Sequence, residues 1–219
     1  MEVSAKAFQI LIAKLYSDRI RAVIREISTN AYDSHLANGN AEEPFLVHLP
    51  TYLEPTFWVR DYGTGLSPEE INSVYFTVFK SSKTEDENST GCLGLGSKSP
   101  LTYADSFMVE SFQNGKRCVY GVHYNDENLP VATPMGTFDT DERNGLKVSV
   151  AVQSGDCGIF VDKATQIFKH FKVMPEIIGT KINIQSRTPT LTGDGWAVFN
   201  GGNSGVVMSN VYYPLRADS

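Results

Sequence analysis

The segment from Asp18 to Ala37 carries the pattern that most restricts the fold of this chain. Its apolar residues recur every three or four positions, as on one side of an amphipathic helix, and they are Ile20, Val23, Ile24, Ile27 and Ala31. Asp18 is a suitable N-cap, and Asn38-Gly39-Asn40 is a typical helix stop. A helix with one apolar stripe must bury that stripe against another layer of structure.

Three polar residues follow the edge of this stripe. Glu26, Asn30 and Asp33 are four and then three positions apart, a spacing that stacks them on one helix face within reach of each other. A solvated helix face is the simpler interpretation. However, a solvent side opposite the stripe is already predicted from four other residues: Arg21, Arg25, Ser28 and His35. The trio is therefore expected to border a pocket, where a Glu can act as a general base on water and an Asn oxygen suits Mg²⁺.

A second polar constellation is VRDYGTGLS, residues 59–67. The strand-like runs at 45–49 and 57–61 are separated by turn residues and predict an antiparallel hairpin that ends at Asp61. Gly63 and Gly65 then permit tight turning and close backbone approach. One interpretation is a solvent-exposed turn closed by an Asx bond. The other is a carboxylate held at the sheet edge, where it accepts a hydrogen bond from an exocyclic amine such as that of adenine.

A third constellation is TGCLGLGSKSP, with glycines at Gly91, Gly94 and Gly96. A polar segment without apolar anchors, residues 80–90, precedes it and predicts a loop. A glycine-rich turn that leads into a helix offers free N–H groups to a phosphate. The spacing is not that of a Walker A loop. By itself this pattern is weak.

The remaining pattern predicts an α+β protein. Ser67 and Glu70 form a capping box at the start of a helix. Other predicted elements are helices at 4–16 and 161–173, and strands at 106–111, 116–124, 146–152 and 206–215. Such an order favours helices packed on an antiparallel or mixed sheet.

Composition excludes several classes of function. The 219 residues carry a net charge of −6 without a cluster of Lys and Arg, so a nucleic-acid partner is not expected. Cys92, Cys118 and Cys157 form no CxxC pair, and the four histidines show no ligand spacing, which argues against a zinc site or a disulfide framework. No apolar run approaches the roughly 20 residues that span a bilayer. A cytoplasmic protein is expected.

In combination, the three constellations are specific. Their order resembles the GHKL superfamily of gyrase, heat-shock chaperone, histidine kinase and MutL-type proteins. EISTNAYD is similar to the ExxxNAxD box of that superfamily, DYGTG to its adenine motif and GCLGLG to its second glycine box. The resemblance covers about residues 5–185. It implies a Bergerat-type two-layer α+β sandwich, with a mixed, mostly antiparallel sheet covered by helices on one face.

A narrower resemblance is to the phage rIIA family. It lies in LYSDRIRAVIREISTNAYDSHLANGN, FKSSKTEDEN and GCLGLGSKSPLTYADSF, and later in GDGWAVFNGGNSGVVMSNVYYPL. It implies an ATP-binding domain at 1–185 and, at 186–219, a β-rich start of a following domain. Members of that family are longer, so this chain is expected to be a truncated or short relative. The likeness also implies a phage protein in the cytoplasm of an infected host, with a membrane-associated partner.

The superfamily resemblance implies a role for each matching residue. Glu26 would activate water for attack on the γ-phosphate of ATP, Asn30 would bind Mg²⁺ and Asp33 would support the pocket. Asp61 would accept a hydrogen bond from the adenine amino group, beside Gly63 and Gly65. Phosphate contacts are implied for five residues: Lys83, Gly91, Gly94, Gly96 and Lys98. For either lysine, a solvated surface position is the alternative. Residues 80–90 would form a lid over ATP.

Two departures from the superfamily pattern matter. The Gly-Thr pair that assists adenine recognition has no clear equivalent: by position it is Gly145-Leu146, while Gly179-Thr180 and Thr137 are alternatives. Residues 186–219 offer no evident source of the cation that related ATPases take from a following domain, so slow turnover is expected.

Three classes of function remain open at this stage. Glu26 favours an Mg²⁺-dependent ATPase over a phosphate-transferring kinase. An ATP-gated module that dimerises or binds a partner, with little hydrolysis, is the main alternative. A scaffold that binds no nucleotide is the third.

Overall fold

The structure is a computed structural model that describes residues 17–76, 95–184, 188–193, 195–200, 204–208 and 210–214. The helix predicted at 4–16 and the loop predicted at 80–90 lie outside these residues. None of the helices in the described part of the chain has the length and apolar character to cross a bilayer.

The first described helix confirms the strongest sequence prediction. α2 spans Arg19–Ala37, and the Asp18 side chain caps it by accepting a hydrogen bond from the Arg21 backbone N–H at 3.1 Å. Four of the five residues of the predicted stripe are buried, with Val23 and Ile24 fully inaccessible, and Ile20 is half-buried. The predicted solvent side is partly wrong, because Ser28 and His35 are also fully buried.

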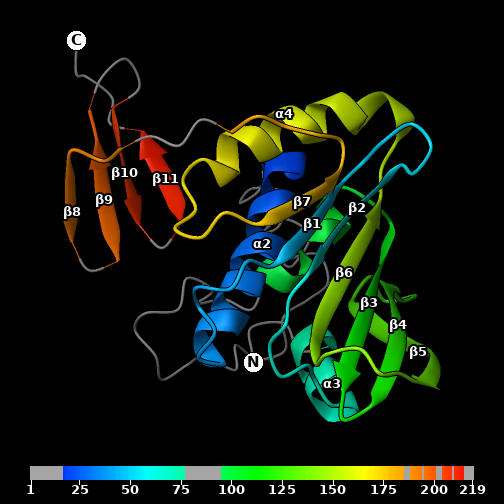
Figure 1. Cartoon of the computed structure of the whole chain (residues 1–219). Helices are drawn as coiled ribbons and strands as arrows, with labels where there is room; N and C mark the ends of the chain where they lie inside the picture. Colours follow the sequence, from blue (N-terminus) through cyan, green and yellow to red (C-terminus); the bar gives the residue numbers. More distant parts are fainter. Residues whose placement is uncertain are drawn as a thin grey trace.

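A single sheet of seven strands forms the second layer (Figure 1). Its strands are β1 (Leu46–Leu49), β2 (Thr56–Arg60), β3 (Ser106–Gln113), β4 (Lys116–Tyr124), β5 (Pro130–Asp139), β6 (Gly145–Ala151) and β7 (Glu176–Gly179). Their order is β5-β4-β3-β6-β2-β1-β7. β7 pairs with β1 in parallel and the other neighbours pair antiparallel. The prediction of a mixed, mostly antiparallel sheet is confirmed.

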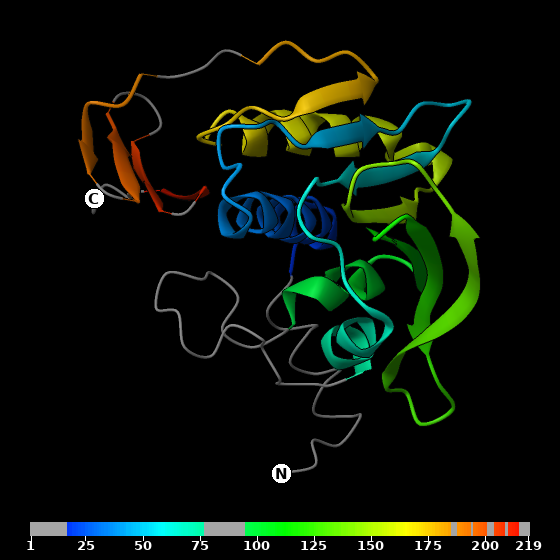
Figure 2. The ribbon, with the colours of Figure 1, turned by 60° about the horizontal axis from the view of Figure 1, so that its bottom comes forward.

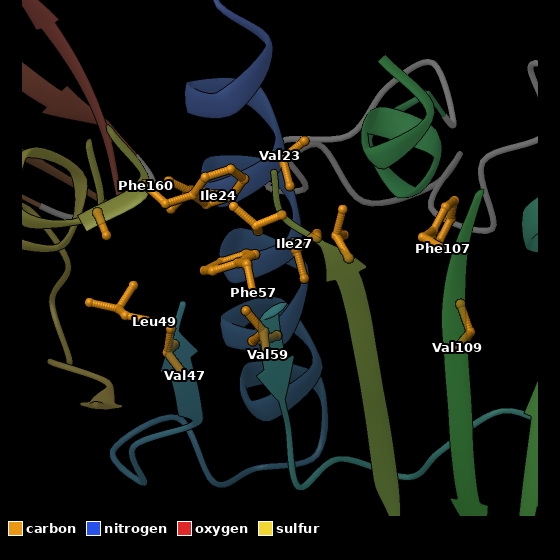
Figure 3. Packing of buried hydrophobic residues seen from close by; sticks show 14 of the residues in the cluster. Val23, Ile24, Ile27, Val47, Leu49, Phe57, Val59, Phe107, Val109 and Phe160 are labelled. Atoms are coloured by element: carbon orange, nitrogen blue, oxygen red, sulfur yellow. The ribbon is translucent and has the colours of Figure 1, made fainter. Parts of the chain in front are cut away.

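Among the described residues, the longer helical elements all contribute to one core on one face of this sheet. Besides α2 they are α3 (Pro68–Phe76), η1 (Gly96–Thr102) and α4 (Cys157–Phe168); a short turn, η2, spans Ser154–Asp156. In Figure 3, Ile24 of α2 and Phe160 of α4 lie close to Phe57 of β2. Alternate residues of the strands, such as Val47 and Leu49, face this core because side chains alternate along a strand. Figure 2 shows α2 and α4 alongside the strands that they cover.

The capping box predicted for α3 is confirmed. The Ser67 backbone N–H donates to Glu70 Oε2 at 2.7 Å, and the Glu70 backbone N–H donates to Ser67 Oγ at 3.2 Å. α3 therefore begins where the sequence places it, directly after the loop that contains Asp61.

Two elements differ from the sequence predictions. The helix predicted at 161–173 is α4, which begins at Cys157 and ends at Phe168. Residues 130–139 were not predicted to be a strand, yet they form β5 at the edge of the sheet. Pro130 and Pro134 are tolerated there because an edge strand leaves part of its backbone unpaired.

A second sheet follows the first. Its four strands are β8 (Leu191–Gly193), β9 (Trp196–Phe199), β10 (Gly205–Met208) and β11 (Val211–Pro214), in the order β11-β10-β9-β8. The strand predicted at 206–215 is thus a hairpin that turns at Asn210. Beyond the end of α4, the His170 ring stacks on Tyr212 at 4.4 Å, and the Lys172 backbone N–H donates to Asn210 Oδ1 at 2.9 Å. These contacts hold the second sheet beside α4.

Candidate functional site

The acidic end of the site is on α2. Glu26 keeps 20% of its side-chain exposure, Asn30 is exposed and Asp33 is half-buried. Glu26 Oε1 accepts hydrogen bonds from Arg25 at 2.6 Å (Nη2) and 3.1 Å (Nε). The carboxylate is therefore held through one oxygen and remains open to solvent.

The other oxygen of Glu26 faces the start of η1. A Cβ atom built on Gly96 would lie 2.6 Å from Glu26 Oε2, so the Gly96 backbone closely approaches the end of this side chain. The acid-bearing helix and the last glycine of the GxxGxG pattern thus meet. Gly91, Gly94 and Lys83 lie outside the described residues, and their phosphate contacts stay predictions.

Asp61 follows β2 and is only 5% exposed. Its Oδ1 accepts hydrogen bonds from the Gly63 backbone N–H at 2.9 Å and from Ser34 Oγ at 3.1 Å. The predicted Asx bond is present, but the interpretation as a solvent-exposed turn is wrong, because α2 covers the carboxylate through Ser34. Burial raises the pKa of Asp61, while the Gly63 and Leu146 N–H groups, the Ser34 hydroxyl and the charge of Arg60 oppose that rise.

The loop after Asp61 is fixed to the last turn of α2 and the residues that follow it. The Tyr62 backbone N–H donates to His35 Nε2 at 2.7 Å, and His35 Nδ1 is 3.0 Å from the Glu43 carbonyl oxygen. The Tyr62 carbonyl oxygen accepts long hydrogen bonds from the side-chain amides of Asn38 and Asn40. One helix therefore contacts η1 near Glu26 and the Asp61 loop near Ser34.

Gly65 lets this loop approach β3. Its φ is +74°, in the left-handed region, and an added Cβ would overlap the Phe112 carbonyl oxygen. We predict that Gly65→Ala destabilises the fold by about 3 kcal/mol, from left-handed strain plus the clash. Gly39 is a matched control, because its φ is +77° with open space around it. Gly39→Ala is expected to cost only about 1 kcal/mol. Urea unfolding of both variants measures the difference, and equal losses would contradict the close approach.

Lys98 is fully buried, so the alternative of a surface lysine is wrong. Its ammonium group donates to the Val74 carbonyl oxygen in α3 at 2.6 Å. This contact joins η1 to α3. Burial lowers the pKa of Lys98 to about 8.

The titration of Lys98 is expected to make stability depend on pH. Between the folded pKa of about 8 and the usual value of 10.5, the unfolded chain binds a proton that the folded protein lacks. The contribution of Lys98 to the free energy of unfolding therefore rises with pH over that interval, by on the order of 3 kcal/mol in total. Urea unfolding of wild type and Lys98→Met at about pH 7 and pH 10.5 isolates the effect, since all other groups titrate in both proteins. A constant difference between the two proteins would show that Lys98 is not desolvated.

A cation cluster behind Asp61 was missed from the sequence. The Arg60 guanidinium is buried, donates to the carbonyl oxygens of Asp61 and Arg143, and lies 4.0 Å from the Phe112 ring centroid. Arg143 in turn pairs with Glu43 and, with Asn40, lowers the Glu43 pKa to about 2. These contacts fix the β5–β6 connection beside the Asp61 loop. Arg143 and Glu43 are 100 residues apart, and no local pattern signals the pair.

The pairing of the strands shows which of the three alternatives for the missing Gly-Thr pair lies beside Asp61. Gly145 opens β6 directly beside Asp61, whose backbone N–H donates to the Leu146 carbonyl oxygen at 2.9 Å. Thr180 follows the pair Leu49–Gly179 at the opposite end of β1 and donates to the Pro50 carbonyl oxygen. Thr137 lies on β5, four strands away from β2. The position beside Asp61 is thus occupied by leucine, not threonine.

Two solved structures with a similar fold are ATPase regions. The ATPase region of Saccharomyces cerevisiae topoisomerase II bound to ICRF-187 (dexrazoxane) is similar with a TM-score of 0.60 at 15% identity, over 81% of this chain and 57% of that chain. A second structure of that ATPase region has a TM-score of 0.52 at 17% identity, over 68% and 43% of the two chains. This chain spans about half the length of those structures. At these identities the likeness shows the fold alone. A search of curated protein sequences found no match.

The sequence itself matches one family model. That model, described as "Histidine kinase-, DNA gyrase B-, and HSP90-like ATPase", matches residues 17–149. The matched segment contains the polar face of α2, the Asp61 loop and Gly96, and it covers more than half of the 219 residues. The protein therefore belongs to the family of histidine kinase-, DNA gyrase B- and HSP90-like ATPases.

Proposed function

We propose that this chain binds Mg–ATP along α2 and hydrolyses it slowly, with Glu26 as the general base. One observation carries the proposal: α2 brings Glu26 to Gly96 and, through Ser34, also contacts Asp61. Eight residues separate Glu26 from Ser34, which is about 12 Å along a helix. That separation is comparable with the distance between the base and the terminal phosphate of a nucleoside triphosphate.

Each residue of the site has a proposed role. The Asp61 carboxylate accepts a hydrogen bond from the adenine amine, and the backbone at Gly63 and Gly65 lies close to the base. The Gly96 N–H contributes to phosphate binding. Glu26 takes a proton from the attacking water. Asp33 supports the pocket, one turn of α2 after Asn30.

A magnesium ion fits this arrangement. Asn30 is exposed one turn after Glu26, so its amide oxygen can act as a single protein ligand while phosphates and water complete the shell. When bound, the ion would neutralise charge on the phosphate oxygens. Within the described residues no group of three or more His, Cys, Asp or Glu side chains could hold a metal alone.

The second candidate function is an ATP-gated interaction or dimerisation module with little hydrolysis. The pairing of Glu26 with Arg25 favours it, because the guanidinium occupies one of the two oxygens of the carboxylate proposed as the base.

The wider context is proposed from sequence resemblance. We place the protein with phage rIIA-like proteins, in the cytoplasm of an infected host, with a membrane-associated partner. The ATP-binding domain would span 1–185, and the second sheet would begin another domain at 186–219. The lid at 80–90 and the phosphate contacts of Lys83, Gly91 and Gly94 complete the proposal, and Lys98 would join them only by leaving its buried contact with the Val74 carbonyl oxygen.

The proposal is tested by calorimetric titration with ATP, with and without Mg²⁺, together with a phosphate-release assay on the same sample. Binding with Mg²⁺-dependent release supports the ATPase. Binding without release supports the ATP-gated module. The absence of binding would overturn both and leave the scaffold class.

A further inference from the structure

We propose that Ser34 and His35, consecutive residues of α2, are positioning residues for base recognition. They hold the Asp61 carboxylate so that Oδ2 faces the exocyclic amine of the base. The inference rests on the proposed function, because it assumes that a nucleotide occupies the site.

The hydrogen bonds of Asp61 are asymmetric. The Gly63 N–H and the Ser34 hydroxyl both donate to Oδ1, at 2.9 Å and 3.1 Å, and neither donates to Oδ2, while the Leu146 N–H also lies near the carboxylate. An ionised carboxylate has about four acceptor positions, so Oδ2 retains the capacity to accept from a ligand. The terminal torsion of an Asp side chain is broad. Two donors on one oxygen therefore stabilise one orientation of the carboxylate.

Ser34 is packed closely enough to perform this role. A Cβ added to Gly63 would overlap Ser34 Oγ and come within 3.2 Å of Ser34 Cβ and of Asp61 Oδ1. The hydroxyl thus lies directly against the turn that it orients. Asp61 is 5% exposed, so solvent cannot readily replace the lost donor if the hydroxyl is removed.

His35 fixes the backbone on the other side of Asp61. Because the Tyr62 N–H donates to Nε2, that nitrogen carries no proton, and Nδ1 carries the proton that is donated to the Glu43 carbonyl oxygen. The ring is fully buried and meets Phe45 edge-on at 6.4 Å. The neutral imidazole thereby bridges the segment before β1 and the loop after β2.

In this arrangement, the single helix α2 positions the residues proposed to contact both ends of the nucleotide. Glu26 lies on the same rigid helix, eight residues before Ser34. A purely structural role for Ser34 would affect stability alone. A positioning role also affects discrimination between bases and the ionisation of Asp61.

Ionisation provides a specific signature. Burial raises the pKa of Asp61, and the Ser34 hydroxyl is one of the groups that oppose the rise. Other ionisable groups near this carboxylate are Arg60 of β2, Tyr75 of α3 and His35 of α2. Loss of the hydroxyl raises the pKa of Asp61 further. Since a protonated carboxyl is a poorer acceptor for an amine, ATP affinity is then lost at a higher pH during acidification.

The experiment compares ATP with purine riboside triphosphate, which lacks the exocyclic amine, by calorimetry between about pH 5 and pH 8. Wild type is expected to prefer ATP by about tenfold or more. In Ser34→Ala, we expect the preference to fall at least about threefold and the pH midpoint of ATP binding to rise. His35→Phe, which fills the ring volume without an acceptor, is expected to lower the preference in the same direction.

Ser111→Ala is the matched control. Ser111 is a buried serine that also holds this loop, through hydrogen bonds with the Leu66 N–H at 2.8 Å and carbonyl oxygen at 2.7 Å, but it forms no hydrogen bond with Asp61. Its loss should lower the thermal midpoint and leave the preference and the pH midpoint unchanged.

The outcomes distinguish a failure of the proposed function from a failure of the proposed positioning role. If wild type binds no ATP, the proposed function fails. If wild type prefers ATP and a folded Ser34→Ala protein keeps both the preference and the pH midpoint, the positioning role is wrong. The same conclusion follows if Ser111→Ala changes both quantities as much as Ser34→Ala does.

Discussion

Glu26→Gln is expected to remove nearly all ATP hydrolysis and to leave ATP binding close to that of wild type. Glutamine has the shape of glutamate but cannot take a proton from water. Loss of a positioned general base reduces turnover by about 10²- to 10⁴-fold. Phosphate release under single-turnover conditions, beside calorimetric titration of the same variant, measures both quantities.

The control for this variant is Glu127→Gln. Glu127 is an exposed glutamate in the turn between β4 and β5, so its replacement changes the net charge equally without touching the site. Hydrolysis by this variant should match wild type. If Glu26→Gln and wild type released phosphate at the same rate, Glu26 would not be the base, and the ATP-gated module would be the better account.

The second large effect is expected for Asp61→Asn. Its amide oxygen can still accept from Gly63 and Ser34, which directs the NH₂ group toward the adenine amine, where an acceptor is needed. Loss of a hydrogen bond to a charged group corresponds to about 1.5–3 kcal/mol, or a 10- to 150-fold loss of ATP affinity. Calorimetric titration measures that loss.

The free energy of unfolding distinguishes a specific loss of ATP affinity from a loss of folded protein. Burial disfavours the charged form of Asp61, so a neutral asparagine in the same place should not lower the free energy of unfolding. Asp126→Asn, at an exposed position of the β4–β5 turn, is the control for the change in charge. A folded Asp61→Asn protein with wild-type affinity for ATP would favour the scaffold class.

The elements predicted well from the sequence are those whose cause is local. α2 has its cap, stripe and stop within a continuous segment, and the Ser67–Glu70 capping box lies within one turn. The hairpin of β1 and β2 joins two strands that are consecutive in the sequence. Local chemistry determines each of these, so one sequence is sufficient.

The prediction for the polar side of α2 was partly wrong because it assigned Ser28 and His35 to solvent from their polarity, without regard to their positions in the helical repeat. Ile24, Ser28, Ala31 and His35 are four, three and four residues apart and therefore share the buried side. Applying the helical period to these residues would have shown that Ser28 and His35 face inward. The contact of His35 with Tyr62 is then the reason that a histidine occupies a buried position.

Contacts between distant segments could not be predicted. Lys98 meets the Val74 carbonyl oxygen only because η1 packs on α3, and Arg143 meets Glu43 across 100 residues. The convergence of Glu26 with Gly96 was implied by resemblance to a family and not by spacing. A three-dimensional arrangement was needed to show which residues support Asp61.

The most direct test of the central claim is a crystal structure of the chain with Mg²⁺ and a non-hydrolysable ATP analogue. We expect the adenine amine within hydrogen-bond distance of Asp61 Oδ2 and the γ-phosphate beside Gly96 and the Glu26 carboxylate. A nucleotide bound with its base away from Asp61, or with its γ-phosphate remote from Glu26, would contradict the account.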